Sequence, residues 1–234
     1  MSVSFKIDGK VCTAEAGEDL VVAAAKNGYF IPTLCYKPGH KCLGTCRVCS
    51  IKSGGKVHAG CTIKVQDGLE LELDTPELAD MRHAMIELLF TEGNHYCPSC
   101  EKSGRCDLQA IAREQKMGVP RFGYNYPSRE KDYSSEKILL ERDRCIFCQR
   151  CVEFIRDEET GKKIFAINKR GAKASISMDI ELANNMSQEQ LAEAVDICPV
   201  GAILAKGQGF DEAIGTRKYD MASVKEYAIK NGGR

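Results

Sequence analysis

Residues 141–157 read ERDRCIFCQRCVEFIRD and carry three cysteines at the spacing C-x2-C-x2-C. Three thiolates this close together can each bind a different iron of one cluster, so the triple suits a four-iron cube better than a single metal ion. Much later in the chain, Cys198-Pro199 ends a predicted helix and supplies a fourth thiolate. The sequence therefore predicts one [4Fe–4S] site. Its expected ligands are Cys145, Cys148, Cys151 and Cys198.

A second group of cysteines lies near the middle of the chain, in CPSCEKSGRC at residues 97–106. Its spacing, C-x2-C-x5-C, leaves one iron of a cube without a ligand, and His95 is the nearest histidine. A neutral imidazole in place of a thiolate removes one negative charge and makes reduction easier, as in Rieske centres. The expected ligands of this second [4Fe–4S] cluster are His95, Cys97, Cys100 and Cys106.

The N-terminal group has the spacing C-x10-C-x2-C-x11-C around the loop GTCRVC at residues 44–49. Plant-type ferredoxins hold a [2Fe–2S] cluster with C-x4-C-x2-C and a remote cysteine, and the first gap here is longer. Glycines in the loop let backbone N–H groups turn toward the sulfurs, and such hydrogen bonds tune the reduction potential. The expected ligands of this [2Fe–2S] cluster are Cys35, Cys46, Cys49 and Cys61.

Cys42 competes with Cys35 for a place in this group, because it lies shortly before the C-x2-C pair. We favour Cys35, which opens the loop after the strand-breaking Pro32, and we interpret Cys42 as a buried spare thiol. Cys12 lies on a predicted strand and is expected to be a small core residue. His40 lies in the cluster loop and could shape it.

The composition narrows the classes of function. The 234 residues carry 33 basic and 33 acidic side chains without a basic stripe, which argues against a nucleic-acid partner. The start, MSVSFKIDGK, lacks the apolar stretch of a signal peptide, and no apolar run approaches the roughly 20 residues of a membrane-spanning helix. We therefore expect a cytoplasmic protein, in which clustered cysteines are more often metal ligands than disulfides. Three cluster sites leave little room for a substrate pocket, and no GxGxxG fingerprint follows a strand, so electron transfer is favoured over direct NAD binding.

The N-terminal part predicts a small mixed sheet packed on one helix. Strands at 3–8 and 11–15 flank Asp8-Gly9, a strong hairpin signal, and a helix is expected at 18–27. Alternating LELEL at 69–73 predicts a last strand before the composition changes.

Helical spacing replaces the strand patterns after this sheet. A helix is expected at 77–90 and another directly after Cys106, and residues 117–135 read as a connecting loop. The expected apolar face of the first of these helices consists of Leu78, Met81, Met85 and Leu88.

The last third predicts short strands at 164–167 and 174–178 and a helix at 188–196. Ser187 and Gln190 form a predicted capping box at the start of that helix.

Together these motifs resemble the N-terminal electron-transfer part of the large iron–sulfur subunit of respiratory complex I, a module that also begins iron-only hydrogenases. They resemble most of all the small diaphorase subunits of cytoplasmic NAD-reducing nickel–iron hydrogenases. The wider family places a histidine four residues before the first cysteine of the second group. That position is Gly93 here, and His95 stands two residues before Cys97. The strings that carry the resemblance span nearly the whole chain and are IPTLCY at 31–36, CLGTCRVCSIK at 42–52, CPSCEKSGRCDLQA at 97–110, ERDRCIFCQRCVEFIRD at 141–157 and ICPVGAIL at 197–204.

The resemblance implies an α+β fold that carries one [2Fe–2S] and two [4Fe–4S] clusters. It also implies a hetero-oligomeric oxidoreductase, in which a diaphorase subunit binds FMN and NAD and the hydrogenase small and large subunits hold the Ni–Fe site. The chain would relay electrons between these modules without a catalytic residue of its own. The expected domains are a β-grasp [2Fe–2S] ferredoxin-like domain at 1–76, a small helical [4Fe–4S] domain at 77–117, a ferredoxin-like [4Fe–4S] domain at 118–205 and a C-terminal interaction tail at 206–234.

The tail is polar and punctuated by glycines, yet Phe210, Ile214 and Tyr219 are unusual in a purely solvated segment. We therefore expect residues 206–234 to lie against a neighbouring subunit and to be ordered by that contact.

Two other interpretations stay open. The chain could be the equivalent iron–sulfur subunit of another NAD-linked complex, such as a formate dehydrogenase or complex I. A zinc-stabilised scaffold is more remote, because zinc favours tetrahedral sets of four ligands and the cysteine triple suits a cube.

Overall fold

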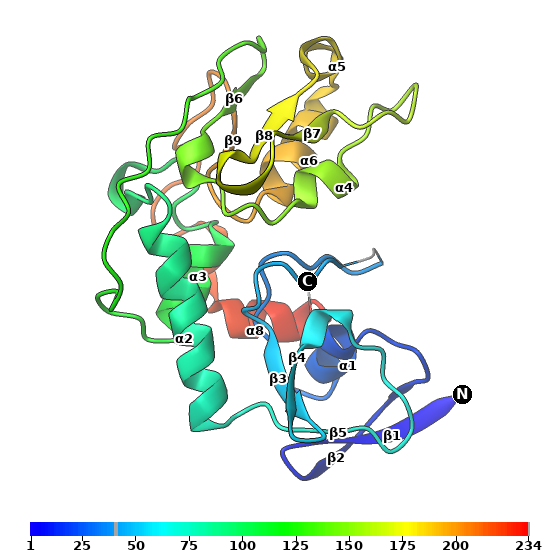
Figure 1. Cartoon of the computed structure of the whole chain (residues 1–234). Coiled ribbons are helices and arrows are strands. Elements are labelled where there is room, and N and C mark those ends of the chain that lie inside the picture. The colour runs from blue at the N-terminus through cyan, green and yellow to red at the C-terminus, as the bar shows by residue number, and fades with distance from the viewer. Residues whose placement is uncertain (40–41, 234) are drawn as a thin grey trace.

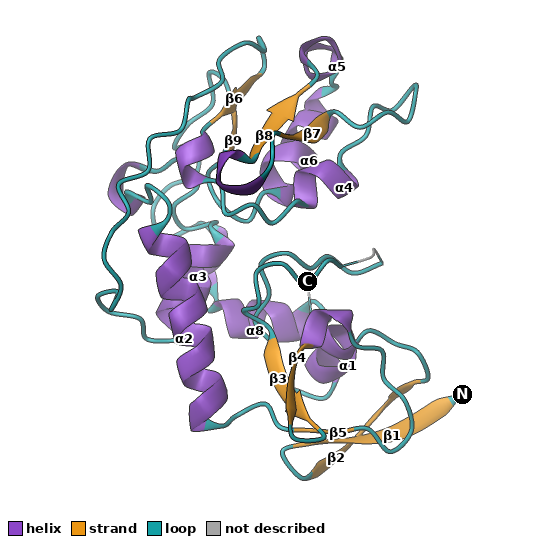
Figure 2. Ribbon diagram, viewed as in Figure 1, coloured by secondary structure: helices purple, strands orange, loops and turns teal. Residues whose placement is uncertain are grey.

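Short strands pair in four small sheets, and helices lie between and around them, within the residues that the computed structural model describes, 1–39 and 42–233 (Figure 1, Figure 2). This arrangement confirms the predicted α+β class. The expectation that His40 shapes the first cysteine loop falls outside the described residues. In that part of the chain, no helix is long and apolar enough to cross a membrane.

The N-terminal part forms a mixed sheet with one helix across it. Its elements are β1 (Ser2–Ile7), β2 (Lys10–Glu15), α1 (Leu20–Lys26), β3 (Ser50–Ser53), β4 (Lys56–Ala59) and β5 (Glu70–Leu71). β1 lies between β2 and β5, antiparallel to the first and parallel to the second. The hairpin turns at Asp8 and Gly9, which take φ of 48° and 77°, as a two-residue turn between twisted strands requires. Backbone hydrogen bonds in both directions between Lys52 and Glu72 join the β3–β4 hairpin to this sheet, which gives the predicted β-grasp arrangement.

The long helix α2 (Pro76–Thr91) leaves the sheet, and the face it turns inward matches the predicted one only in part: Leu78 is buried and Met85 packs against the core. The residues it buries are Leu78, Arg82, Ile86, Glu87 and Thr91. The apolar face predicted from spacing shares only Leu78 with this set. The reason is Arg82, whose Nη2 donates to the carbonyl oxygens of Ser50 (2.7 Å) and Leu73 (2.8 Å) and so fixes the rotation of the helix against the sheet.

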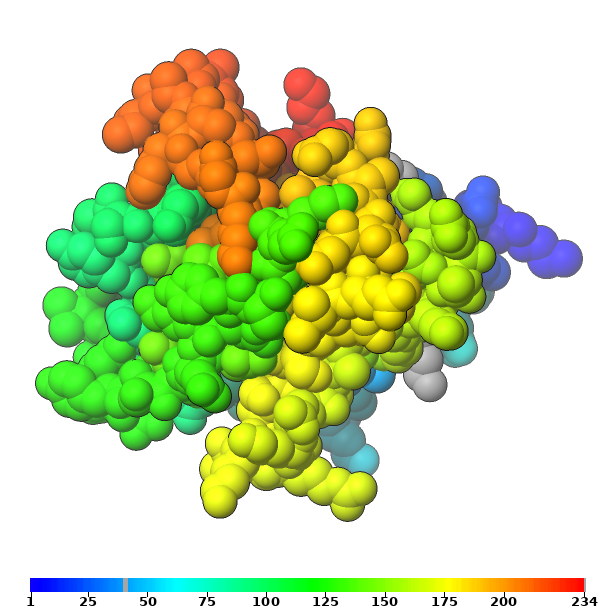
Figure 3. Space-filling view, turned by 90° about the horizontal axis from the view of Figure 1, so that it is seen from above, coloured from blue at the N-terminus to red at the C-terminus, as the bar shows by residue number. Residues whose placement is uncertain are grey.

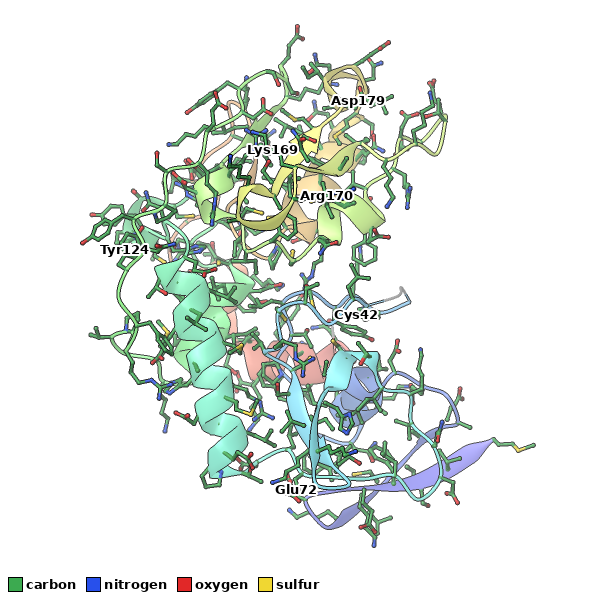
Figure 4. All side chains as sticks on the ribbon, viewed as in Figure 1. Cys42, Glu72, Tyr124, Lys169, Arg170 and Asp179 are labelled. Carbon is green, nitrogen blue, oxygen red and sulfur yellow. The ribbon has the colours of Figure 1, made fainter. Side chains whose placement is uncertain are left out.

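A second helix, α3 (Asp107–Glu114), starts directly after Cys106, as predicted. The chain then runs as an irregular loop over residues 117–131 and reaches the third part of the fold. Tyr124, labelled in Figure 4, lies on this loop and points away from the body of the molecule.

The third part holds two antiparallel strand pairs and three helices within the described residues. Its elements are β6 (Ile138–Leu140), α4 (Arg150–Phe154), β7 (Phe165–Asn168), β8 (Ser175–Met178), α5 (Ile180–Asn185), α6 (Gln188–Ile197) and β9 (Ile203–Ala205). β6 pairs with β9 and β7 with β8, so the cysteine triple and Cys198 are brought to the same end. The predicted capping box is only half made. Ser187 Oγ accepts a hydrogen bond from the Gln190 amide (3.1 Å), whereas the Gln190 side chain donates to the carbonyl oxygen of Arg156.

Part of the C-terminal segment packs on this chain itself, whereas its expected contact with a neighbouring subunit stays a prediction. It forms α7 (Lys218–Met221) and α8 (Val224–Lys230), and α8 packs against α3 and α1 (Figure 1). Tyr219 is buried, whereas Phe210 and Ile214 are 63% and 86% exposed. In the view from above, the segment around residue 210, orange, lies on the surface (Figure 3).

Candidate iron–sulfur sites

Five cysteine thiols, rather than four, gather at the loop that follows α1. Cys61 Sγ lies 3.2 Å from the Sγ atoms of both Cys42 and Cys49, and Cys42 Sγ lies 3.8 Å from Cys35 Sγ. Cys46 also contacts Cys35 through its thiol. The four predicted ligands therefore come together, and Cys42, which we expected to be a buried spare thiol, is half-buried among them.

The loop that carries these thiols faces the third part of the molecule. Cys42, labelled in Figure 4, lies on this loop, and its Sγ approaches Cys61 of the N-terminal part. Lys37 reaches across, with its Nζ 3.6 Å from Glu193 of α6 and 5.4 Å from the ring centroid of Phe154. The first cysteine group is thus held against the third group's helices.

The backbone of the loop turns its N–H groups toward the thiols. Gly44 and Arg47 take φ of 64° and 57°, and alternation of right- and left-handed residues makes a concavity that favours anionic ligands. The Val48 amide donates toward the Cys46 thiol, and the Cys46 amide donates toward Cys35. This arrangement fits a cluster bound by thiolates, as the cysteine spacing predicts.

The second group lies in the loop between α2 and α3. Cys100 and Cys106 are buried, and Cys97 is half-buried. Cys106 is the N-cap residue of α3, and its Sγ accepts a hydrogen bond from the Gln109 amide (3.4 Å). Burial raises the pKa of the Cys106 thiol to about 12, so this site releases the thiol proton when a metal binds.

His95 is placed as a neutral imidazole with one free ring nitrogen. Its Nε2 atom is buried and has no hydrogen-bond partner among the described residues. Burial, and then the charge of Arg144, lower the pKa of His95 to about 4, against the opposing effect of a hydrogen bond to the Leu89 backbone. The neutral ring thus has an Nε2 lone pair without a partner, which a metal could use.

Gly93 makes room for this imidazole. A Cβ atom at position 93 would lie 2.3 Å from His95 Nε2 and 2.7 Å from Cδ2. The ring therefore fills the space into which a side chain at position 93 would project.

All four predicted thiols of the third group line one small apolar cavity. Apolar side chains complete the lining, among them Ile146, Ile176 and Val200. Phe147 and Gln149, which separate the cysteines of the triple, take φ of 53° and 64°. These left-handed residues turn amides inward, and the Phe147 amide donates toward the Cys145 thiol. Burial raises the pKa of that thiol to about 11.

The second and third groups share a stretch of backbone. The carbonyl oxygen of Pro199, next to Cys198, accepts a hydrogen bond from the Asp107 amide (2.9 Å) and contacts Cys106 Sγ at 3.5 Å. Gly201 approaches Cys100 so closely that a Cβ atom there would lie 2.8 Å from its Sγ. The two sites are therefore separated by only a few atoms of this chain.

Known proteins with similar sequences cover the whole chain. It is 59% identical over 230 residues to the gamma subunit of the NAD-reducing hydrogenase HoxS from Cupriavidus necator, and the match covers 98% of each chain. The chain belongs to the gamma-subunit family of NAD-reducing hydrogenases. A solved structure titled as the NAD+-reducing [NiFe]-hydrogenase in the H2-reduced state contains a chain that matches with a TM-score of 0.87 and 33% identity over 98% of both chains.

Subunits of NADH-quinone oxidoreductases are similar to this chain over part of their own length. An NADH-quinone oxidoreductase subunit of Rickettsia felis is 31% identical over 229 residues, but the chain spans only 33% of that protein. Three known domain families also match. They are a 2Fe-2S iron-sulfur cluster binding domain at residues 1–76, an NADH-ubiquinone oxidoreductase-G iron-sulfur binding region at 82–121 and the ferredoxin-like domain of NADH-quinone oxidoreductase subunit 3 at 135–204.

The gamma-type subunit also holds an internal ion pair that the sequence analysis missed. Arg150, inside the cysteine triple, places its Nη1 3.1 Å from Oδ2 of Asp107, the residue after Cys106. Both residues line a cavity of about 530 Å3, together with Tyr219 and Lys218 of the C-terminal segment. The available signal was a charged residue within or directly beside each cysteine motif.

Proposed function

We propose that this chain is an electron-transfer subunit that relays electrons between a nickel–iron hydrogenase module and a flavin/NAD diaphorase module. The observation that carries the proposal is the convergence of three cysteine-rich groups in one chain of the gamma-subunit family, with the second and third groups joined through Pro199. The reaction served is H2 + NAD+ to NADH + H+. The chain contributes no catalytic residue and binds neither FMN nor NAD directly.

Twelve residues are proposed to hold one [2Fe–2S] and two [4Fe–4S] clusters. The clusters accept and release one electron at a time, and the chain holds them, excludes water and supplies backbone N–H groups that tune their potentials. The proposed ligands are Cys35, Cys46, Cys49 and Cys61 for the [2Fe–2S] cluster, His95, Cys97, Cys100 and Cys106 for one [4Fe–4S] cluster, and Cys145, Cys148, Cys151 and Cys198 for the other.

The proposed division into domains is the one inferred from the sequence, with boundaries at 1–76, 77–117, 118–205 and 206–234. The proposed partners are a flavin/NAD-binding diaphorase subunit and the hydrogenase small and large subunits, in a cytoplasmic complex. Phe210 and Ile214, which are 63% and 86% exposed, are the apolar side chains of the C-terminal segment that we propose to contact a partner.

A place in a complex I-type or formate dehydrogenase complex is the alternative. The NADH-quinone oxidoreductase relatives support it through their similarity, but the chain spans 33% of the one from Rickettsia felis, against 98% of the hydrogenase gamma subunit. The length match favours the hydrogenase. A zinc scaffold is disfavoured by the closely spaced triple, whose thiols line a single cavity.

The experiment is metal and sulfide analysis of anaerobically purified full chain, followed by identification of the chains that co-purify with it from its own cells. We expect about ten irons per fully loaded chain, from one two-iron and two four-iron clusters. Co-purifying hydrogenase subunits and hydrogen-dependent reduction of NAD by the complex would support the role. About four irons, zinc in place of iron, or a complex without hydrogenase activity would contradict it.

A further inference from the structure

The ion pair between Arg150 and Asp107 joins the second and third cysteine groups. Arg150 stands between Cys148 and Cys151 of the third group, and Asp107 follows Cys106 of the second. Both residues also line one cavity with Thr33 and Tyr36, which lie on either side of Cys35 in the sequence. The pair therefore connects two cysteine groups and borders the segment that carries the first.

Little of the pair is exposed, although it lines the cavity of about 530 Å3. The Arg150 side chain is 10% exposed and that of Asp107 17%. Arg150 Nε is buried with no hydrogen-bond partner among residues 1–39 and 42–233. Charges in such partly buried positions are screened less than charges on the open surface.

The C-terminal segment holds the acidic member of the pair. Tyr219 donates its hydroxyl to Asp107 Oδ1 at 2.6 Å, and Lys218 Nζ lies 3.5 Å from the same oxygen. The Asp107 carboxylate thus faces two cationic side chains, Arg150 and Lys218, and the Tyr219 hydroxyl, which together favour its anionic form. Its second oxygen is thereby left to Arg150.

Reduction adds one electron to a cluster and makes its charge more negative by one unit, so a nearby fixed positive charge favours the reduced form and a fixed negative charge opposes it. We propose that Arg150 and Asp107 set the reduction potentials of the neighbouring clusters with opposite signs, and that Tyr219 keeps Asp107 in place. Arg150 raises the potential of the third cluster, and Asp107 lowers that of the second. This inference rests on the ligand sets of the proposed function.

The test is a redox titration of the full chain, purified anaerobically with its clusters, with dithionite as reductant and electron paramagnetic resonance as readout. Arg150→Gln should lower the ratio of reduced to oxidised third cluster at a fixed potential by roughly tenfold, which is about 59 mV for a one-electron couple. Arg150→Lys should retain most of the parent potential. Asp107→Asn should shift the second cluster in the opposite direction, toward easier reduction.

The matched control is Lys163→Gln, which removes a positive charge from the same part of the fold. Lys163 is 40% exposed in its pair with Glu153, so water screens it and no potential should move. A merely structural role for the ion pair would lower iron content in both charge variants and would not move the potentials in opposite directions.

Opposite shifts at full iron content, with rescue by lysine, support the proposal. Unmoved potentials, or shifts of the same sign in both charge variants, overturn it while leaving the proposed function intact. If Arg150→Gln loses iron, the Asp107→Asn variant is the test. An unchanged reduction potential of the second cluster in that variant overturns the proposal. A parent chain without iron–sulfur signals instead contradicts the proposed function and removes the basis of this inference with it.

Discussion

The imidazole of His95 occupies the space that a side chain at Gly93 would need, because a Cβ atom at position 93 would lie 2.3 Å from His95 Nε2. The position of the His95 ring therefore depends on the absence of a side chain at position 93. A side chain placed at position 93, where the family resemblance would put a histidine, would project into the space that the His95 ring fills.

The first prediction follows from the lack of space for a side chain at position 93. Gly93→Ala should displace His95 and make the second cluster labile, because the new methyl group meets the buried ring and the backbone oxygen of Asp143 rather than a flexible chain end. Gly93→His combined with His95→Ala should restore the cluster. The measurement is iron content and the rate of iron loss to a chelator.

The matched control for that prediction is Gly118→Ala, since a Cβ atom there meets nothing within 4 Å. It should retain iron at the parent rate. A Gly93→Ala chain that is as stable as this control would show that the two positions are independent.

The second prediction concerns the charge that His95 brings to its cluster. His95→Cys replaces a neutral ligand with a thiolate, so the reduction potential of the second cluster should fall. His95→Ala should leave one iron without a protein ligand and make the cluster labile. Redox titration and iron analysis check both outcomes. Unchanged potential and occupancy in both variants would mean that another group holds that iron.

The third prediction separates Cys42 from Cys35, which the thiol distances alone do not. Cys35 is 5% exposed and receives the Cys46 amide, whereas Cys42 is half-buried. We therefore expect Cys42→Ser to keep the [2Fe–2S] spectrum and Cys35→Ser to lose or strongly alter it. The reverse result in electron paramagnetic resonance would exchange the two residues in the ligand set.

Local signals predicted most of the elements, because they act over a few residues. Asp8-Gly9 made the hairpin, and Ser187 began α6. The rotation of α2 was missed because it depends on Arg82, a charged residue that is buried only where Ser50 and Leu73 offer carbonyl oxygens. Such partners are distant in sequence and become neighbours only in the folded chain.

The candidate sites, too, were predicted only where the signal is local in sequence. The spacing of the cysteines was enough to predict which thiols of the first and third groups lie together, because most ligands of one cluster are close in sequence. The gathering of Cys42 into the first group and the pairing of Arg150 with Asp107 depend on how separate segments pack. The C-terminal helices were missed because their few apolar residues are buried by other parts of the chain, as Tyr219 is.

The last prediction is that the C-terminal segment stabilises the second cluster from within the chain. Arg217 Nη1 donates to the Ser103 carbonyl (3.1 Å) and the Tyr219 amide to the Gly104 carbonyl (2.8 Å), so the segment holds the loop between Cys100 and Cys106. Tyr219→Phe removes the hydroxyl that donates to Asp107 at 2.6 Å, at a cost of about 1.5–3 kcal/mol for a hydrogen bond to a charged group. Iron should then leave the second cluster faster, while the other two spectra persist. Tyr227→Phe, whose ring lies 5.9 Å from that of Tyr219, is the control, and equal rates of iron loss in the two variants would contradict the prediction.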